Sequence, residues 1–288
     1  MKRMRLAHLI LAHDRVSQLE RLIKRMAHPS ADIFLHVDGK ANIADFDGFK
    51  NLNNVYFISR RIKVHWGKYS VVQATLSSME EILVNGKEYS HINLLSAQDY
   101  LLKRNEEVVD FFLANTGKDF MTALPLEKEF SCALERVEKY NFGDYRIPGI
   151  YKIQAIVNYL MPPRKAPRGL ELHGLSQWMA ITPESASYVI NYLKNSPKTR
   201  RYFRMTGGPD EFIFQTILHS SPYKNNIIDD NLRYIKFQSG SVHPDTFTMD
   251  NSKEVISSGK FFARKFDAEA DPDILNYLDA IAGVSPGL

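Results

Sequence analysis

The sequence predicts an α/β fold in which helices flank one open, mostly parallel sheet. Three observations predict it: short apolar segments typical of buried strands, apolar residues at helical spacing between them, and polar residues directly after several strands. With 288 residues, 44% hydrophobic and 24% charged, the composition is that of an ordinary globular chain. This length allows one large α/β domain or two small ones.

The first hundred residues alternate between strand and helix. Strands are expected at residues 6–12, 32–39, 54–59 and 91–95, and helices at 16–26 and 69–84. Pro29 ends the first of these helices, and a strand follows directly. The segment 6–39 is therefore a β–α–β unit, which normally forms a parallel strand pair with a right-handed crossover.

The second half is less regular. Residues 135–153 mix aromatic and charged side chains without a clean period, and residues 161–169 form a proline-rich basic loop. The alternation then resumes, so we expect this loop to be an excursion within one domain. Further strands are expected at 176–182 and 233–237, and further helices at 183–193 and 212–218.

Charge, cysteine content and motifs exclude several classes of protein. The 37 basic and 33 acidic residues are spread along the chain, whereas nucleic-acid binders concentrate their basic residues. The single cysteine, Cys132, excludes an internal disulfide framework and a multi-cysteine metal site. No segment reaches the roughly 20 apolar residues of a membrane-spanning helix. Neither a Gly-x-Gly-x-x-Gly motif nor a Walker-type loop follows the first strand, which weakens dinucleotide-binding and P-loop interpretations.

Polar residues at three strand ends predict a shared pocket. His13, Asp38 and Asp99 each follow one of the expected strands. Ligands of open α/β sheets bind outside the carboxyl ends of the strands. Each residue alone is equally well explained as a turn or helix-cap residue. Three such residues at matching positions favour a ligand site.

The segment around Glu211 contains a candidate general base. Gly207-Gly208 permits a tight turn with positive φ, and Pro209 suits the first turn of a helix. Asp210 and Glu211 then lie at the positive end of that helix. Glu211 is therefore a candidate proton acceptor on a fixed turn. The alternative, that both acids only cap the helix, stays open.

Other candidates concern phosphate, sugar and metal. Lys260, Arg264 and Lys265 form a cationic segment suited to phosphate oxygens, or an exposed basic surface. Trp178 is either an apolar platform for a sugar ring or a core residue. The triplets Asp45-Phe46-Asp47 and Asp271-Pro272-Asp273 do not follow apolar strands, and no histidine spacing suits zinc. We therefore expect no metal site.

Seven segments, taken in order, resemble one known family. They are His8–His13, His36–Lys40, Trp66–Ser70, Leu94–Tyr100, Ser176–Trp178, Pro209–Phe212 and Phe262–Asp267. Together they are similar to the core-2/I-branching enzyme family, which contains β-1,6-N-acetylglucosaminyltransferases and peptide O-xylosyltransferases. The segments extend over about nine-tenths of the chain. Animal members carry a membrane anchor and several disulfides, and the absence of both patterns here suggests a bacterial-type member.

The resemblance implies a GT-A-like nucleotide-sugar fold. It also implies inverting transfer of a GlcNAc- or xylose-like sugar from a UDP-sugar to an acceptor hydroxyl, with no metal or other cofactor. Glu211 matches the family's catalytic base, and Lys265 matches a cation that neutralises the UDP diphosphate. The other implied positions are Arg264 and Arg233 for the diphosphate, His13, Asp38, Trp66 and Tyr69 for the nucleotide, and Asp99, Trp178 and Asp210 for donor or acceptor sugar.

The resemblance also leads to expectations about organisation and partners. We expect one domain over residues 1–288, with a nucleotide-binding half (1–125) and an acceptor-binding, catalytic half (126–288). The expected partners are a UDP-sugar and a carbohydrate, glycolipid or peptide hydroxyl, without nucleic acid. We expect a cytoplasmic protein of cell-surface polysaccharide synthesis, with peripheral association at the inner face of the membrane left open. A glycoside hydrolase with two carboxylates and a non-catalytic nucleotide- or carbohydrate-binding protein remain alternatives.

Overall fold

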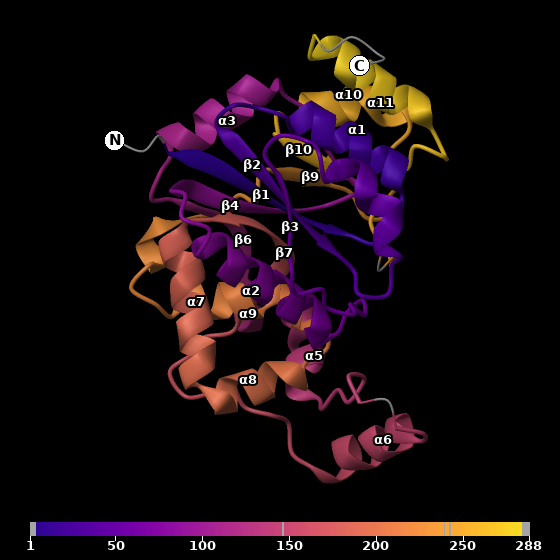
Figure 1. Cartoon of the computed structure of the whole chain (residues 1–288). Helices are drawn as coiled ribbons and strands as arrows, with labels where there is room; N and C mark the ends of the chain where they lie inside the picture. The colour runs from indigo at the N-terminus through magenta and orange to yellow at the C-terminus, as the bar shows by residue number, and fades with distance from the viewer. Residues whose placement is uncertain (1–3, 146, 239, 242, 284–288) are drawn as a thin grey trace.

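The computed structural model describes residues 4–145, 147–238, 240–241 and 243–283. A seven-stranded sheet has the order β3-β2-β1-β4-β7-β6-β8, and a three-stranded sheet has the order β5-β10-β9 (Figure 1). The strands of the large sheet are β1 (Arg5–Ala12), β2 (Ala31–Val37), β3 (Val55–Phe57), β4 (Tyr89–Ser96), β6 (Asp119–Pro125), β7 (His173–Ile181) and β8 (Ile227–Ile228). Those of the small sheet are β5 (Asp99–Leu101), β9 (Arg233–Ile235) and β10 (Phe262–Arg264).

Helices connect the strands. The α-helices are α1 (Val16–Met26), α2 (Tyr69–Leu83), α3 (Asn105–Ala114), α4 (Leu126–Glu129), α5 (Leu134–Glu138), α6 (Ile150–Leu160), α7 (Pro183–Asn195), α8 (Pro197–Arg204), α9 (Ile213–His219), α10 (Ser252–Ser257) and α11 (Pro272–Ile281). Two 3₁₀ helices matter for the site and for the predicted metal triplets, η1 (Ile43–Phe49) and η3 (Pro209–Glu211).

The strand pairing confirms the predicted α/β fold. β1 lies parallel to both β2 and β4, and β3 is parallel to β2. β7 is antiparallel to its neighbours β4 and β6. It is therefore a reversed strand in a sheet whose other strands run parallel to one another. The chain thus has a GT-A-like arrangement, with a mostly parallel central sheet between helices.

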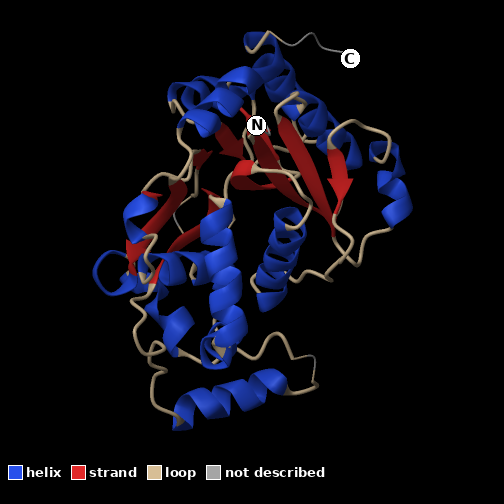
Figure 2. Cartoon of the chain, turned by 60° about the vertical axis from the view of Figure 1, so that its left-hand side comes forward, coloured by secondary structure: helices blue, strands red, loops and turns tan. Residues whose placement is uncertain are grey.

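Two apolar clusters cover the two faces of the large sheet. Leu6 and Ile10 of β1 pack in the cluster that includes α1, α3, α11 and the small sheet. Ala7 and Leu9 pack in the other cluster, with α2, α7 and α9. Because β1 is buried on both faces, its sequence is a continuous apolar run rather than an alternation. Both views show the sheet between these helical layers (Figures 1 and 2).

Several elements differ from the sequence-based expectations. The strand expected at 54–59 shortens to β3, and the strand expected at 233–237 shortens to β9, which belongs to the small sheet. The helix expected to begin at Phe212 begins at Ile213, because the preceding residues form η3. The sequence predicts an irregular stretch at 135–153, yet this stretch contains α5 and the start of α6.

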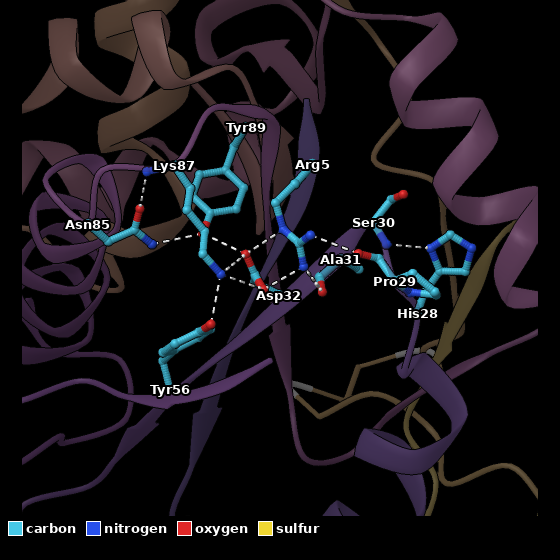
Figure 3. A network of polar contacts seen from close by, with 10 residues as sticks. All are labelled: Arg5, His28, Pro29, Ser30, Ala31, Asp32, Tyr56, Asn85, Lys87 and Tyr89. Carbon is cyan, nitrogen blue, oxygen red and sulfur yellow. Dashed lines mark hydrogen bonds and ion pairs between the residues drawn. The ribbon is translucent and has the colours of Figure 1, made fainter. Parts of the chain in front are cut away.

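A buried ion network joins the amino ends of the parallel strands (Figure 3). The carboxylate of Asp32 is fully buried and accepts hydrogen bonds from Arg5 at 2.7 and 2.8 Å, from Lys87 at 3.0 Å and from the Tyr89 hydroxyl at 2.8 Å. Burial alone would raise the pKa of Asp32, but bonds from Arg5, Tyr89 and Lys87 hold it below its usual value. This network closes the amino edge, opposite the edge where ligands of such sheets bind.

Candidate active site

Glu211 lies at the end of a single tight turn. Gly208 has φ 61°, in the left-handed region that favours glycine, which confirms the positive-φ turn expected there. Pro209 then starts η3, and Glu211 ends it. The side chain of Glu211 is 33% exposed, so solvent and small molecules reach it.

Arg136 of α5 holds the carboxylate of Glu211. Its Nη1 donates to Oε2 of Glu211 at 2.8 Å, and its Nε donates to the carbonyl of Gly207 at 3.1 Å. The guanidinium also stacks over the ring of Phe212 at 4.7 Å. Among the described residues no hydrogen-bond donor contacts Oε1 of Glu211, and the side chain as a whole is 33% exposed. Sequence analysis missed Arg136, because it lies in the stretch without periodicity.

The neighbouring carboxyl group of Asp210 is in a different environment. Asp210 is only 8% exposed, and its Oδ1 has no hydrogen-bond partner among the described residues. Burial, and then the charge of Glu211, raise the pKa of Asp210 to about 7. Two adjacent acids thus differ in character, one ion-paired and accessible, the other buried and close to half-protonated at neutral pH. A sugar contact for Asp210 stays a prediction.

The segment Trp66–Tyr69 packs against the turn that carries Glu211. The backbone N–H of Gly208 donates to the carbonyl of Gly67 at 3.1 Å. Trp66 is 70% exposed, and its ring lies 5.1 Å from the ring of His243. Tyr69 is buried at the start of α2, where its N–H donates to Asp144 at 3.2 Å. Of the two aromatic residues expected at the nucleotide, Trp66 is the accessible one.

Asp38 organises the loop that leads to Trp66. Its Oδ1 accepts the backbone N–H of Lys40 at 2.8 Å and that of Val64 at 3.3 Å. The end of β2 is thereby tied to the loop that precedes Trp66. His13 follows β1 and is exposed, with its Nε2 3.3 Å from a carboxylate oxygen of Asp14.

Lys265 joins the same region from the far end of the chain. It follows β10, and its backbone exchanges hydrogen bonds with Asp245 and Phe247. The loop between β9 and β10 therefore contacts Lys265 through Asp245 and Trp66 through His243. The side chain of Lys265 is partly exposed, and no described residue forms an ion pair with it. The Trp66 segment thus contacts the Glu211 turn through Gly67, and it contacts, through His243, the segment that also bonds to the backbone of Lys265.

Four other candidates form a buried cluster between the two sheets. The guanidinium of Arg264 lies 3.8 Å from the ring centre of Trp178 and 3.6 Å from Oδ2 of Asp99. Arg233 donates to the carbonyl of Leu94 at 2.7 Å, and burial lowers its pKa to about 10. All four side chains are at most one-tenth exposed, so they brace the sheets, and a role at the diphosphate or sugar stays a prediction.

The remaining acidic and basic candidates have local partners. Lys260 pairs with Asp230 at 2.7 Å, and Asp47 of η1 pairs at 2.6 Å with Lys50, the residue after this helix. Asp271 caps α11 by accepting the backbone N–H of Asp273 at 2.9 Å. In the described part of the chain, no three His, Cys, Asp or Glu side chains form a group that could hold a metal ion.

Comparison with known proteins identifies the family of the chain. The family model described as "Branch: Core-2/I-Branching enzyme" matches residues 6–260. Xylosyltransferase 2 of Canis lupus familiaris is 25% identical over 96% of this chain and 33% of its own, and xylosyltransferase 1 of Rattus norvegicus is 25% identical over 96% and 35%. The chain spans about a third of the length of these relatives. Since the family model covers most of the sequence, the chain belongs to the core-2/I-branching enzyme family of glycosyltransferases.

Proposed function

We propose that this protein transfers a sugar from a UDP-sugar to an acceptor hydroxyl, with inversion at the anomeric carbon and without a metal ion. The observation that carries the proposal is the state of Glu211, one carboxylate oxygen held by Arg136 and the other open. The contact between Gly208 and Gly67 supports it, because it sets this base beside the segment expected at the nucleotide. The names of the matched relatives make UDP-xylose the first donor to test, followed by UDP-GlcNAc.

The residues suggest a division of labour. Oε1 of Glu211 accepts the proton of the acceptor hydroxyl as that oxygen attacks the anomeric carbon. The bond from this carbon to the diphosphate breaks, and its electron pair leaves with UDP. Lys265 offsets the negative charge that grows on the diphosphate, which fixed cations stabilise most strongly in the transition state. Arg136 positions Glu211 and takes no proton.

Glu211→Gln tests this assignment directly. The variant keeps size and hydrogen-bonding capacity but loses the basic oxygen, so we expect the rate of UDP release in the presence of acceptor to fall at least ~100-fold. UDP affinity, measured by calorimetry, should stay within about twofold of the unmodified protein. Glu135→Gln is the matched control, because Glu135 precedes Arg136 in the chain but is exposed, and its one ion pair among the described residues is with Lys139. A folded Glu211→Gln protein with ordinary turnover would contradict the proposal.

The hydrolase alternative needs a second accessible carboxylate near Glu211. The two residues considered for it are Asp210, which is 8% exposed, and Asp99, which is fully buried beside Arg264. Neither reaches the surface next to Glu211. The geometry therefore favours transfer with a single base.

A further inference from the structure

Helix α6 has its polar side toward the protein and its apolar side outward. Oε1 of Gln154 accepts the backbone N–H of Phe142 at 2.7 Å. Asn158 accepts the N–H of Tyr140 at 2.7 Å and donates to its carbonyl at 2.9 Å. No residue of α6 is buried, and both views show the helix apart from the sheet and its covering helices (Figures 1 and 2). A helix on the surface of a globular protein normally turns its apolar side toward the core and its polar side toward solvent.

The outward side of α6 is a continuous apolar strip. Ile153, Ile156 and Leu160 follow one another at spacings of three and four residues, so they share one face of the helix. Ile156 is 58% exposed, Leu160 70% and the neighbouring Tyr159 88%. Patches of this kind mark surfaces that bind a partner or a membrane.

Basic residues are frequent in the segments next to this strip, and the exposed acidic residues beside it, Glu135 and Glu138, belong to α5. Residues 145–170 contain five Lys or Arg and no Asp or Glu, and residues 185–209 have the same balance. The second segment includes α8, where Arg200, Arg201 and Arg204 are exposed. The residue after α8, Met205, accepts hydrogen bonds from Asn141 and Arg164, which flank α6 on either side. The rest of the chain carries more acidic than basic residues, so these two segments hold the positive excess of the sequence.

We propose that α6 docks on the surface of an anionic lipid bilayer. Its apolar side chains enter the boundary between headgroups and acyl chains, and the surrounding cations face the lipid phosphates. The 11-residue helix is too short to cross the bilayer, and none of the helices in the described ranges is long and apolar enough to do so. A second copy of this chain is not the partner we propose for the apolar strip, since two α6 faces would bring like charges together.

Flotation of the intact protein with vesicles tests the proposal, and it needs neither donor nor acceptor. We expect the protein to float with vesicles rich in phosphatidylglycerol and to remain below with phosphatidylcholine alone. High salt should release much of the bound protein, because the electrostatic part is screened. Ile156→Ser with Leu160→Ser should weaken binding at least ~10-fold, as two inserted side chains are lost.

Matched variants distinguish this interaction from non-specific hydrophobic binding to vesicles. Val84→Ser removes an apolar side chain of 81% exposure at the end of α2 and should leave vesicle binding unchanged. Lys165→Glu with Arg168→Glu should reduce binding to anionic vesicles, while circular dichroism confirms the fold of each variant.

Three outcomes would overturn the proposal. The first is a native protein that does not float with anionic vesicles. The second is a protein with serines at positions 156 and 160 that floats equally well. The third is a concentration-dependent dimer that forms through α6 in place of vesicle binding, which would assign the strip to a second copy. Transfer to a water-soluble acceptor, measured in parallel, shows separately whether the proposed function holds.

Discussion

The difference in unfolding free energy between Asp210→Asn and the unmodified protein should shift in favour of the variant as the pH rises from acidic to neutral and alkaline values. The native structure raises the pKa of Asp210 from 3.8 to about 7, because the carboxyl group is buried beside Glu211 and lacks a partner for Oδ1. Between these two values the native state holds a proton that the unfolded chain has released. The stabilisation from this proton is complete below pH 3.8 and is lost as the pH rises through about 7.

The size of the effect follows from the pKa. For each pH unit of rise over which the carboxyl group is protonated in the native state alone, the unfolding free energy falls by about 1.4 kcal/mol. Because the native state has released half of this proton at the upper limit, the rise from about pH 5 to about pH 7 removes about 2 kcal/mol of unfolding free energy from the unmodified protein. The asparagine side chain of the variant has no proton to release, so the variant escapes this loss. Other buried groups, such as His8 with its pKa near 3, titrate in both proteins and cancel in the difference.

Urea unfolding at several pH values from about 5 to 8 measures this difference. Asp110→Asn is the control for removing an acidic group, since Asp110 is exposed on α3. If the curves for the unmodified protein and Asp210→Asn stay parallel over this range, the buried neutral state of Asp210 is wrong.

Two further predictions concern the ion network and the leaving group. Asp32→Asn removes the carboxylate that Arg5 and Lys87 share, so we expect a loss of about 2–4 kcal/mol in unfolding free energy by urea titration; a loss below ~1 kcal/mol would contradict this. For the diphosphate, we expect turnover to persist in excess EDTA, and Lys265→Ala to lower the rate more than UDP affinity, because the extra charge exists mainly in the transition state. Loss of activity in EDTA with recovery in Mn²⁺ would refute the metal-independent proposal.

The strands of the large sheet could be predicted where burial leaves a continuous apolar run. The expected ends of β1 and β2 agree with the observed ends to within two residues, because both faces of these strands are covered. The orientation of β7 was not predictable, since an apolar strand has the same composition whether its neighbour runs parallel or antiparallel. β8 and β10 have only two and three residues, too few for a periodic signal.

The candidate site could be predicted only in part. The Gly207–Glu211 turn has a local signal, since glycine and proline restrict the backbone in a recognisable way. The burial of Arg233 and Arg264 has no local signal, because a charged residue in a sequence is normally expected at the surface. The ring of Trp178 and the carboxylate of Asp99, which enclose Arg264, become neighbours only in the folded chain. The reversed orientation of α6 likewise depends on hydrogen bonds to residues outside the helix, in which Gln154 accepts from Phe142 and Asn158 donates to Tyr140.

The closure of the first apolar cluster has a consequence for synthesis on the ribosome. Gln18 of α1 donates to the carbonyl of Phe266 at 3.1 Å and accepts the N–H of Ala268 at 2.8 Å. Tyr100 donates to Asp279 at 2.7 Å, and Phe266 and Leu278 fill the same cluster as Leu6. The amino-terminal half therefore lacks part of its core until residues 262–279 have left the ribosome. During that interval it depends on contacts far apart in sequence, which form slowly and leave apolar surface open to chaperones.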